Sequence, residues 1–260
     1  MACCPEGSLP SLQTSYEPRG KEIKVKDLDA YLVGQGSRAL IVAYDIYGFG
    51  RTSGRARAVC DQLANEGFLV IMPDFFRGTA WPVGKTFDDT MGTWLKTMPY
   101  EPQVCSDVHA NVVPYLREQH GAKCIGMAGF CWGAWLIQKV SSVPEVLSCG
   151  VSFHPSLQIE ETLFGGSIDE MIGAVKCPQL LMPAGNDLNM VQAGGQVITK
   201  LKASDIERVR DGSRIHAFPD MMHGFMLKAA LDVGDEKVKR DVSAAFRLAV
   251  DYFNKYMGEL

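Results

Sequence analysis

Residues 129–133, with the sequence Gly-Phe-Cys-Trp-Gly, join an apolar run to an apolar helical stretch. The preceding residues 124–128 predict a buried strand, and residues 134–140 predict a helix. A sharp corner between a strand and a helix needs small neighbours on both sides, because the corner side chain projects over the sheet while the helix packs against the strand. The spacing Gly-x-Cys-x-Gly therefore predicts a nucleophile elbow with Cys131 at the corner.

This elbow would place Cys131 at the N-terminus of a helix. The partial positive charge and unpaired N–H groups there favour a thiolate and can also receive a developing oxyanion. Taken alone the motif is a moderate signal, since a free cysteine is more often a small core residue than a nucleophile. A catalytic role therefore requires partners elsewhere in the chain.

Two later segments supply such partners. Residues 179–187 predict a buried strand that opens into a loop carrying Asp187, and residues 214–225 predict a strand and loop that present His223. Asp187 alone could be a turn residue and His223 alone could cap a loop. Their occurrence after the elbow, in the order nucleophile, acid, histidine, favours a catalytic triad. His154, at the end of the predicted strand 148–154, is a rival base, but the chain order favours His223.

The composition predicts one compact domain. The chain has 260 residues, of which 47% are hydrophobic and 22% charged, and no linker or repeat divides it. We expect a flexible tail over residues 1–20 and a single domain over residues 21–260. The net charge of −4 argues against nucleic acid as a partner. No apolar run is long enough for a bilayer span and no signal peptide is recognisable, so we expect a cytoplasmic protein without membrane contact.

The cysteines predict neither a disulfide framework nor a metal site. None of them shows paired Cys-x-x-Cys spacing, and most are expected to be reduced thiols. The cysteines at 124, 149 and 177 fall in or beside predicted strands and are expected to pack in the core, whereas Cys3 and Cys4 fall in the expected mobile tail. The eight are Cys3, Cys4, Cys60, Cys105, Cys124, Cys131, Cys149 and Cys177.

Strands and helices alternate along the rest of the chain. Residues 21–33 predict an antiparallel hairpin at a sheet edge, and the other predicted strands cover residues 38–44 and 68–72. Predicted helices cover residues 52–66, capped by Thr52 or Ser53, and residues 103–119, 191–203 and 236–256. This order is typical of a doubly wound, mostly parallel sheet with helices on both faces.

Several loops at the ends of the predicted strands are expected to complete the site. The N–H groups of Ile46 and Trp132 are the predicted oxyanion hole. Substrate contacts are predicted from loop residues, because ligands bind beyond the carboxyl ends of parallel strands. Phe75 is expected to be a core residue, Arg77 could equally be a surface group, and the aromatic stretch 79–102 could form a wall of the pocket. The predicted contacts are Tyr47, Phe76, Arg77 and Phe225.

The Cys131 elbow, the segments around Asp187 and His223, and the loop 45–48 together resemble the dienelactone hydrolase (carboxymethylenebutenolidase) family. The resemblance extends from about residue 21 to residue 256 and implies an α/β-hydrolase fold. It also implies hydrolysis of an enol-lactone or related ester by a cysteine nucleophile, without metal or organic cofactor. Family members carry a glutamate, thought to help release the thiolate, at the place of Asp45, which is one methylene shorter. Arg77 lies near one family position that binds the substrate carboxylate, and Lys228 follows the histidine.

The expected function is therefore hydrolysis of a lactone or small ester, a small-molecule substrate, through a Cys131–His223–Asp187 triad and a thioester acyl-enzyme. Two alternatives remain open at this stage. Cys131 could be a redox-sensing thiol, or the domain could be a non-catalytic binding module. We expect a monomer or a weak homodimer.

Overall fold

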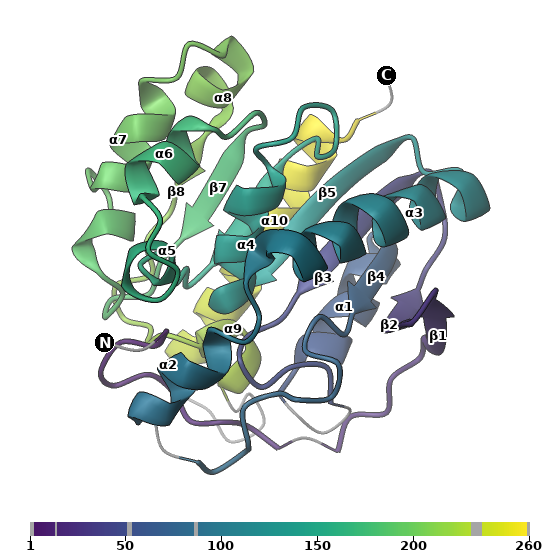
Figure 1. The fold of residues 1–260 in the computed structure, drawn as a ribbon, viewed down its shortest axis with the longest axis horizontal. Helices are drawn as coiled ribbons and strands as arrows, with labels where there is room; N and C mark the ends of the chain where they lie inside the picture. Colours follow the sequence, from purple (N-terminus) through teal and green to yellow (C-terminus); the bar gives the residue numbers. More distant parts are fainter. Residues whose placement is uncertain (1–2, 14, 51–53, 86–87, 230–235, 259–260) are drawn as a thin grey trace.

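The computed structural model describes residues 3–13, 15–50, 54–85, 88–229 and 236–258. Within these residues the strands form an eight-stranded sheet in the order β1-β2-β4-β3-β5-β6-β7-β8 (Figure 1). β2 is antiparallel to both neighbours, and every other adjacent pair is parallel. The strands are β1 (Lys21–Val25), β2 (Leu28–Val33), β3 (Arg38–Ala43), β4 (Leu69–Pro73), β5 (Cys124–Phe130), β6 (Gly150–Phe153), β7 (Gln179–Met182) and β8 (Arg214–Ile215). The predicted fold, a mostly parallel sheet with an N-terminal hairpin, is confirmed.

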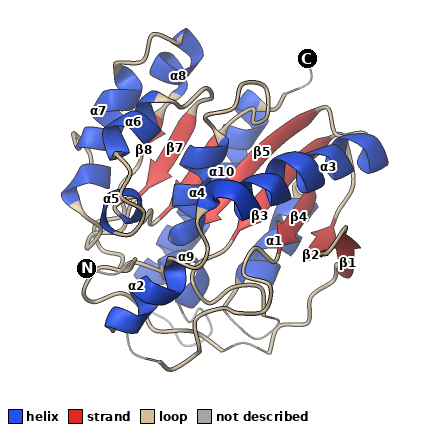
Figure 2. Cartoon of the chain, in the orientation of Figure 1, coloured by secondary structure: helices blue, strands red, loops and turns tan. Residues whose placement is uncertain are grey.

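Helices cover both faces of the sheet. Figure 2 shows α3 (Val113–His120) and α4 (Trp132–Val140) in front of it, and α1 (Ala56–Asn65) and α10 (Glu236–Tyr256) behind it. The remaining helices are α2 (Asp89–Leu95), α5 (Ile159–Thr162), α6 (Ile168–Gly173), α7 (Gln196–Lys202), α8 (Glu207–Gly212) and α9 (Phe225–Lys228). Three short turns of other helical types are η1 (Tyr100–Val104), η2 (Asp107–Val112) and η3 (Asn189–Val191).

The central position of β5 follows from its composition. All of its residues are buried, and it pairs with β3 on one side and β6 on the other. A strand between two helical layers is covered on both faces, so its sequence is continuously apolar rather than alternating. The elbow is therefore anchored at the middle of the sheet.

Some element boundaries differ from the predicted ones. The helix predicted over residues 52–66 begins at Ala56, and its expected caps, Thr52 and Ser53, lie outside the described residues. The helix predicted over residues 191–203 is divided into η3 and α7, because Gly194 between them takes a left-handed conformation with φ of 76°. Pro114 is accommodated in the first turn of α3, where a missing N–H breaks no helical bond.

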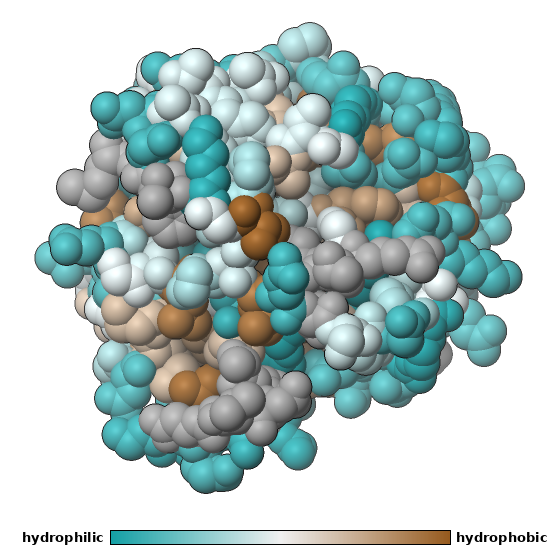
Figure 3. Space-filling view, turned by 90° about the horizontal axis from the view of Figure 1, so that it is seen from below, coloured by the Kyte–Doolittle hydropathy of each residue, from teal (hydrophilic) through white to brown (hydrophobic). Residues whose placement is uncertain are grey.

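On the coloured part of the surface that faces down in Figure 1, hydrophobic groups gather in several patches among hydrophilic ones (Figure 3). Among the described helices, none has both the length and the apolar character needed to traverse a lipid bilayer.

The loops that follow β3, β5, β6, β7 and β8 all leave the sheet from its carboxyl edge, since these strands are parallel. The topology thus gathers the predicted site residues at one edge.

Candidate active site

Cys131 occupies the corner between β5 and α4 with φ of 54° and ψ of −110°. A positive φ is rare and strained for a residue with a side chain, and such strain is typical of functional corners. The corner is held by backbone bonds: Cys131 N–H donates to the carbonyl of Phe153 at 3.1 Å, and its own carbonyl accepts from Ala134 and Ser156. The predicted elbow is therefore present.

Gly133 allows α4 to lie directly on β3. A Cβ at this position would lie 2.1 Å from the carbonyl oxygen of Ala43, a rigid backbone atom. We predict that Gly133→Ala lowers the free energy of unfolding by about 2–4 kcal/mol, because either the helix or the strand must shift. Urea unfolding would measure this change. Gly173→Ala is the matched control, because its Cβ would meet only a flexible lysine side chain; an equal loss in both variants would contradict the prediction.

Asp187 fixes the imidazole of His223. The Nδ1 atom of His223 lies 2.6 Å from Oδ1 of Asp187, and Oδ2 of that carboxylate accepts from the backbone N–H of Ala184 at 2.7 Å. The backbone N–H of His223 donates to Oδ1 of Asn186 at 2.6 Å. Because both bonds of the Asp187 carboxylate are buried, the ring has one orientation, with Nε2 turned away from the carboxylate.

The Nε2 atom of His223 is directed at sulfur. It has no partner of full hydrogen-bond geometry among the described residues, but the side chains of Cys131 and Cys4 both interact with the ring. Burial alone would lower the pKa of His223, yet the negative charge of Cys131 and the bond to Asp187 outweigh it and raise the pKa well above the ordinary value. The structure thus brings together the sulfur, the imidazole and the carboxylate that the sequence predicted to converge.

The N-terminal cysteines require a correction. Cys3 and Cys4 were expected in a mobile tail, but their exposed fractions are 0% and 6%. Their Sγ atoms lie 3.4 Å and 3.8 Å from Sγ of Cys131, and Gln158 donates to the carbonyl of Cys3. A small apolar thiol can fill the space over the elbow, which explains why this end of the chain packs inward. Cys131 itself is fully buried beneath them.

A buried ion pair lies beside the thiols. Nζ of Lys228 is 3.8 Å from Oδ2 of Asp45, and Oδ1 of Asp45 accepts from the N–H of Tyr47 at 3.0 Å. Burial raises the pKa of Asp45 although Lys228 opposes it. Burial lowers the pKa of Lys228, but Asp45, Cys4 and Cys131 together raise it. Oδ2 of Asp45 has no hydrogen bond within the described chain, so this carboxylate does not touch the thiol in the way the family glutamate is thought to.

The predicted oxyanion donors come from two elements: Trp132 directly follows Cys131, and Ile46 lies in the loop after β3. Trp132 is the first residue of α4, so its N–H has no acceptor in the preceding turn. Ile46 follows β3, and its carbonyl accepts from the N–H of Trp81 at 2.9 Å, which orients this loop. Their role toward an oxyanion stays a prediction.

Aromatic rings form one wall near the elbow. Phe76 packs on Trp132 with ring centroids 4.6 Å apart and on Trp94 at 5.1 Å, which ties the stretch 79–102 to the site. Phe75 is buried, as expected. Arg77 instead forms a two-pronged ion pair with Asp107 at 2.7 Å and 2.8 Å and reaches toward Asp27. The structure therefore engages its guanidinium in structural contacts and supports the surface alternative.

Two other predicted contacts border the buried groups. Nζ of Lys228 lies 5.0 Å from the ring centre of Tyr47, and the ring of Phe225 lies 5.7 Å from that of His154. His154, the rival base, has a ring 4.9 Å from His223. Neither of its nitrogens has a hydrogen-bond partner in the described chain, and burial lowers its pKa well below the ordinary value. Because His154 lacks an orienting carboxylate, His223 is the better base.

Some residues at the site could not be recognised from the sequence. Oγ of Ser156 lies 3.3 Å from Sγ of Cys131. Asn186 links His223 to the carbonyl of Glu6, which accepts from its Nδ2 at 2.8 Å. Neither residue belongs to a recognisable motif. The adjacent pair Cys3-Cys4 was assigned to a mobile tail, because without a fold its contact with Cys131 could not be inferred.

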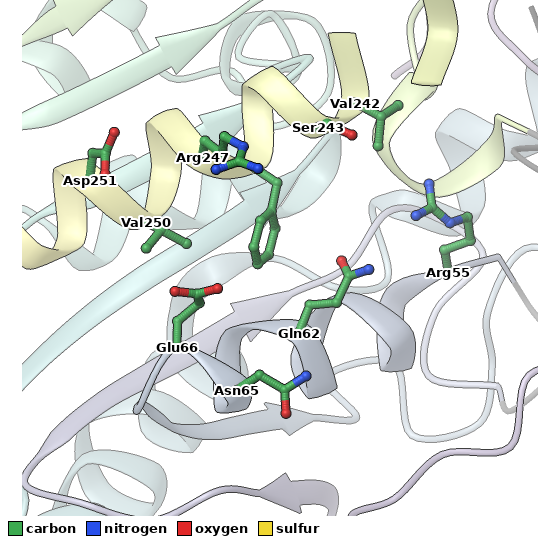
Figure 4. Close-up of a pocket in the computed structure, with 10 residues that line it drawn as sticks. Arg55, Gln62, Asn65, Glu66, Val242, Ser243, Arg247, Val250 and Asp251 are labelled. Carbon is green, nitrogen blue, oxygen red and sulfur yellow. The ribbon is translucent and has the colours of Figure 1, made fainter. Parts of the chain in front are cut away.

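One hollow of the surface lies away from this cluster, and another borders it at Cys4. A pocket of about 420 Å³ between α1 and α10 is lined by side chains such as Gln62 and Arg247 and includes none of the groups above (Figure 4). Another pocket, of about 700 Å³, lies between residues 4–8 and α2, where Figure 1 shows the N-terminus beside α2. Cys4 lines this second pocket. The approach to Cys131 from this side therefore ends at the N-terminal segment, residues 3–13.

Known proteins of similar sequence or fold match nearly the whole chain. A family model described as the dienelactone hydrolase family matches residues 28–257. The chain is 27% identical to hydrolase tropI of Talaromyces stipitatus, covering 99% of this chain and 97% of the relative. It is 29% identical to the carboxymethylenebutenolidase homolog of Rattus norvegicus, covering 93% of each. A crystal structure of a putative dienelactone hydrolase from Klebsiella pneumoniae matches with a TM-score of 0.66 and 19% identity, covering 96% of this chain and 100% of the other.

Proposed function

The chain belongs to the dienelactone hydrolase family and is an ester or lactone hydrolase, and we propose that it works through Cys131, His223 and Asp187 by way of a thioester. The observation that carries this proposal is the bond of 2.6 Å between His223 and Asp187, on a ring that interacts with the sulfur at a strained elbow. A nucleophile, a base and an orienting acid in one chain of contacts are the parts that nucleophilic acyl transfer requires.

In the first step the thiolate of Cys131 attacks the carbonyl carbon, and the N–H groups of Ile46 and Trp132 receive the oxyanion. The positive end of α4 and the ammonium of Lys228 stabilise negative charge at the same place. Collapse of the tetrahedral intermediate releases the alcohol or enolate, which takes a proton from the His223 imidazolium. The product of this step is a thioester on Cys131.

In the second step His223 activates water. The negative charge of Cys131 is a major contributor that raises the pKa of His223, and a thioester no longer carries that charge. The imidazolium therefore becomes less stable after acylation, and the neutral ring is available as a general base. Water attacks the thioester, the acid is released, and the proton on His223 restores the thiolate–imidazolium pair.

The proposed substrate is an enol-lactone or a small activated ester. A thiolate is itself a good leaving group, so the tetrahedral intermediate can expel Cys131 again. The first step is therefore productive only where the leaving group of the substrate is at least as stable as the thiolate. An enolate meets this condition. The relatives named carboxymethylenebutenolidase homolog point to the same class. Arg77 is paired to Asp107, whereas the buried ammonium of Lys228 interacts electrostatically with Cys131.

The thioester is the distinguishing intermediate. With a small aryl ester, protein quenched in acid during turnover should carry the acyl group on the peptide that contains Cys131, detected by mass spectrometry. His223→Ala should slow release of the acyl group and increase the trapped fraction. An acyl group found on another residue, or turnover with no covalent species under either condition, would contradict the proposed mechanism.

Access to Cys131 requires the N-terminal segment to move. Besides the sulfur contacts, the bonds that hold the described residues of this segment include the N–H of Leu9 to the carbonyl of His223 at 2.9 Å and Asn186 to Glu6. We predict that removing residues 1–8 speeds alkylation of Cys131 by iodoacetamide about tenfold or more, since an exposed thiol reacts faster than a covered one. The labelled Cys131 peptide measures the rate.

The half-buried Cys105 is the internal control, because its surroundings do not include the removed residues. Its alkylation rate should be equal in both proteins, and circular dichroism should show an unchanged fold. Equal rates at Cys131 would mean that the segment does not limit access to the sulfur.

A further inference from the structure

Three sulfur atoms from two distant parts of the chain meet at the elbow. The Sγ atoms of Cys3, Cys4 and Cys131 all lie within 4.8 Å of one another, and all three residues are buried. The hydrolytic cycle uses only one of these sulfurs. The other two therefore need an explanation of their own.

The sulfur separations match a thiolate-bound metal better than a disulfide. Cys131 lies 3.4 Å from Cys3 and 3.8 Å from Cys4. With Zn–S bonds of about 2.3 Å, two sulfurs of a tetrahedral site lie about 3.8 Å apart. A disulfide requires about 2.0 Å and would leave the third sulfur without a role.

A fourth ligand is already oriented toward the sulfurs. Nε2 of His223 is fully buried, lacks a hydrogen-bond partner among the described residues, and its ring interacts with Cys4 and Cys131. Its other nitrogen bonds Asp187 at 2.6 Å. A histidine that binds zinc almost always donates its second N–H to a carboxylate or carbonyl, which fixes the ring and the tautomer.

We propose that Cys3, Cys4, Cys131 and His223 form a tetrahedral binding site for a thiophilic divalent cation, with Zn²⁺ as the model ligand. Binding displaces the protons of the sulfurs that are not already thiolates and the Nε2 proton of the His223 imidazolium, and all these protons leave to solvent. Three thiolates and Zn²⁺ carry a net charge of −1, and the ammonium of Lys228, which interacts electrostatically with Cys4 and Cys131, balances it. No oxidation occurs.

Metal binding would inhibit the hydrolase activity. The metal would occupy the lone pairs of Cys131 and His223, so neither could act as nucleophile or base, and it would lock the N-terminal segment over the site. This consequence rests on the proposed function, whereas binding itself does not. The site would thus make ester turnover dependent on the free concentration of the cation.

Cobalt titration of the full-length chain tests the site without any substrate. In the absence of oxygen and with a non-thiol reductant, one equivalent of Co²⁺ should give sulfur-to-metal charge-transfer absorption and intense tetrahedral d–d bands, which Zn²⁺ then displaces. The double variant Cys3→Ser and Cys4→Ser should lose the charge-transfer bands and bind more than about 100-fold more weakly. Asp187→Asn should weaken binding about 10–100-fold through the outer contact. Cys105→Ser is the matched thiol control and should bind as the wild type does.

The outcomes separate the two proposals. The metal site would be overturned if the wild type showed no charge-transfer bands, or if the bands persisted in the double variant. It would also be overturned if Cys3 and Cys131 formed a disulfide in air and the reduced protein gave no cobalt spectrum. Stoichiometric Zn²⁺ should inhibit hydrolysis by the wild type but not by the double variant. Cobalt bands in a protein without ester turnover would support the metal site and refute the hydrolase mechanism instead.

Discussion

Replacing Cys131 by alanine is expected to lower kcat for a small aryl ester by about 10,000-fold or more. The substitution removes the atom that forms the covalent intermediate, and loss of a nucleophile leaves only the modest catalysis that binding and oxyanion donors supply. The remaining geometry should persist, because the elbow is held by backbone bonds to Phe153 and Ser156. Steady-state kinetics would measure the loss.

Cys177→Ala is the matched control for this experiment. Cys177 is also a buried free cysteine, but it contacts Ser141 and Gln179 rather than the site. It should retain wild-type kcat. Undiminished turnover in the Cys131 variant would show that the esterase activity arises elsewhere and would remove the proposed role of the elbow.

Replacing Asp187 by asparagine is expected to lower kcat by about 1,000- to 10,000-fold. An amide can donate to Nδ1 and so stabilise the wrong tautomer, with the proton on Nε2, where the base must accept one. The bond from Asp187 is also one of the contributions that raise the pKa of His223. Without it the imidazolium is less stable, so the pKa falls. The alkaline limb of the pH profile of kcat/KM, where the imidazolium of the free enzyme loses its proton, should therefore move to lower pH.

The nearby Asp220→Asn variant is the control for charge alone. Asp220 is half exposed and pairs loosely with Lys237 at 3.8 Å, in the loop that precedes His223. Its kinetics and pH profile should equal those of the wild type. A full kcat in Asp187→Asn, or an alkaline limb that stays in place, would mean that this carboxylate does not orient the base.

The elbow and the triad were predictable because the forces that place them are local or topological. The glycines at 129 and 133 are dictated by contacts within a few residues and by the approach of α4 to β3. Asp187 and His223 follow parallel strands, and the carboxyl ends of parallel strands meet at one edge. Composition and order along the chain therefore carry this information.

Other features of the site depend on contacts that no local pattern encodes. Arg77 was a candidate substrate contact, but its guanidinium forms an ion pair with Asp107. This pairing requires Asp107 to face Arg77 from a separate helical turn. Asp45 was placed with the thiol by resemblance, yet its shorter side chain bonds Tyr47 and lies near Lys228. Which groups form such ion pairs and hydrogen bonds depends on side-chain geometry, which is established only when the chain has packed.

The sequence by itself determined the α/β architecture, the strained corner at Cys131, and the order of nucleophile, acid and base. Only the tertiary structure decided that Cys3 and Cys4 cover the nucleophile, since the contact joins residues 128 positions apart. Periodicity and turn chemistry act over a few residues, whereas the burial of a terminal segment depends on the shape of the cavity that all the loops create together. That cavity exists only once the sheet has formed.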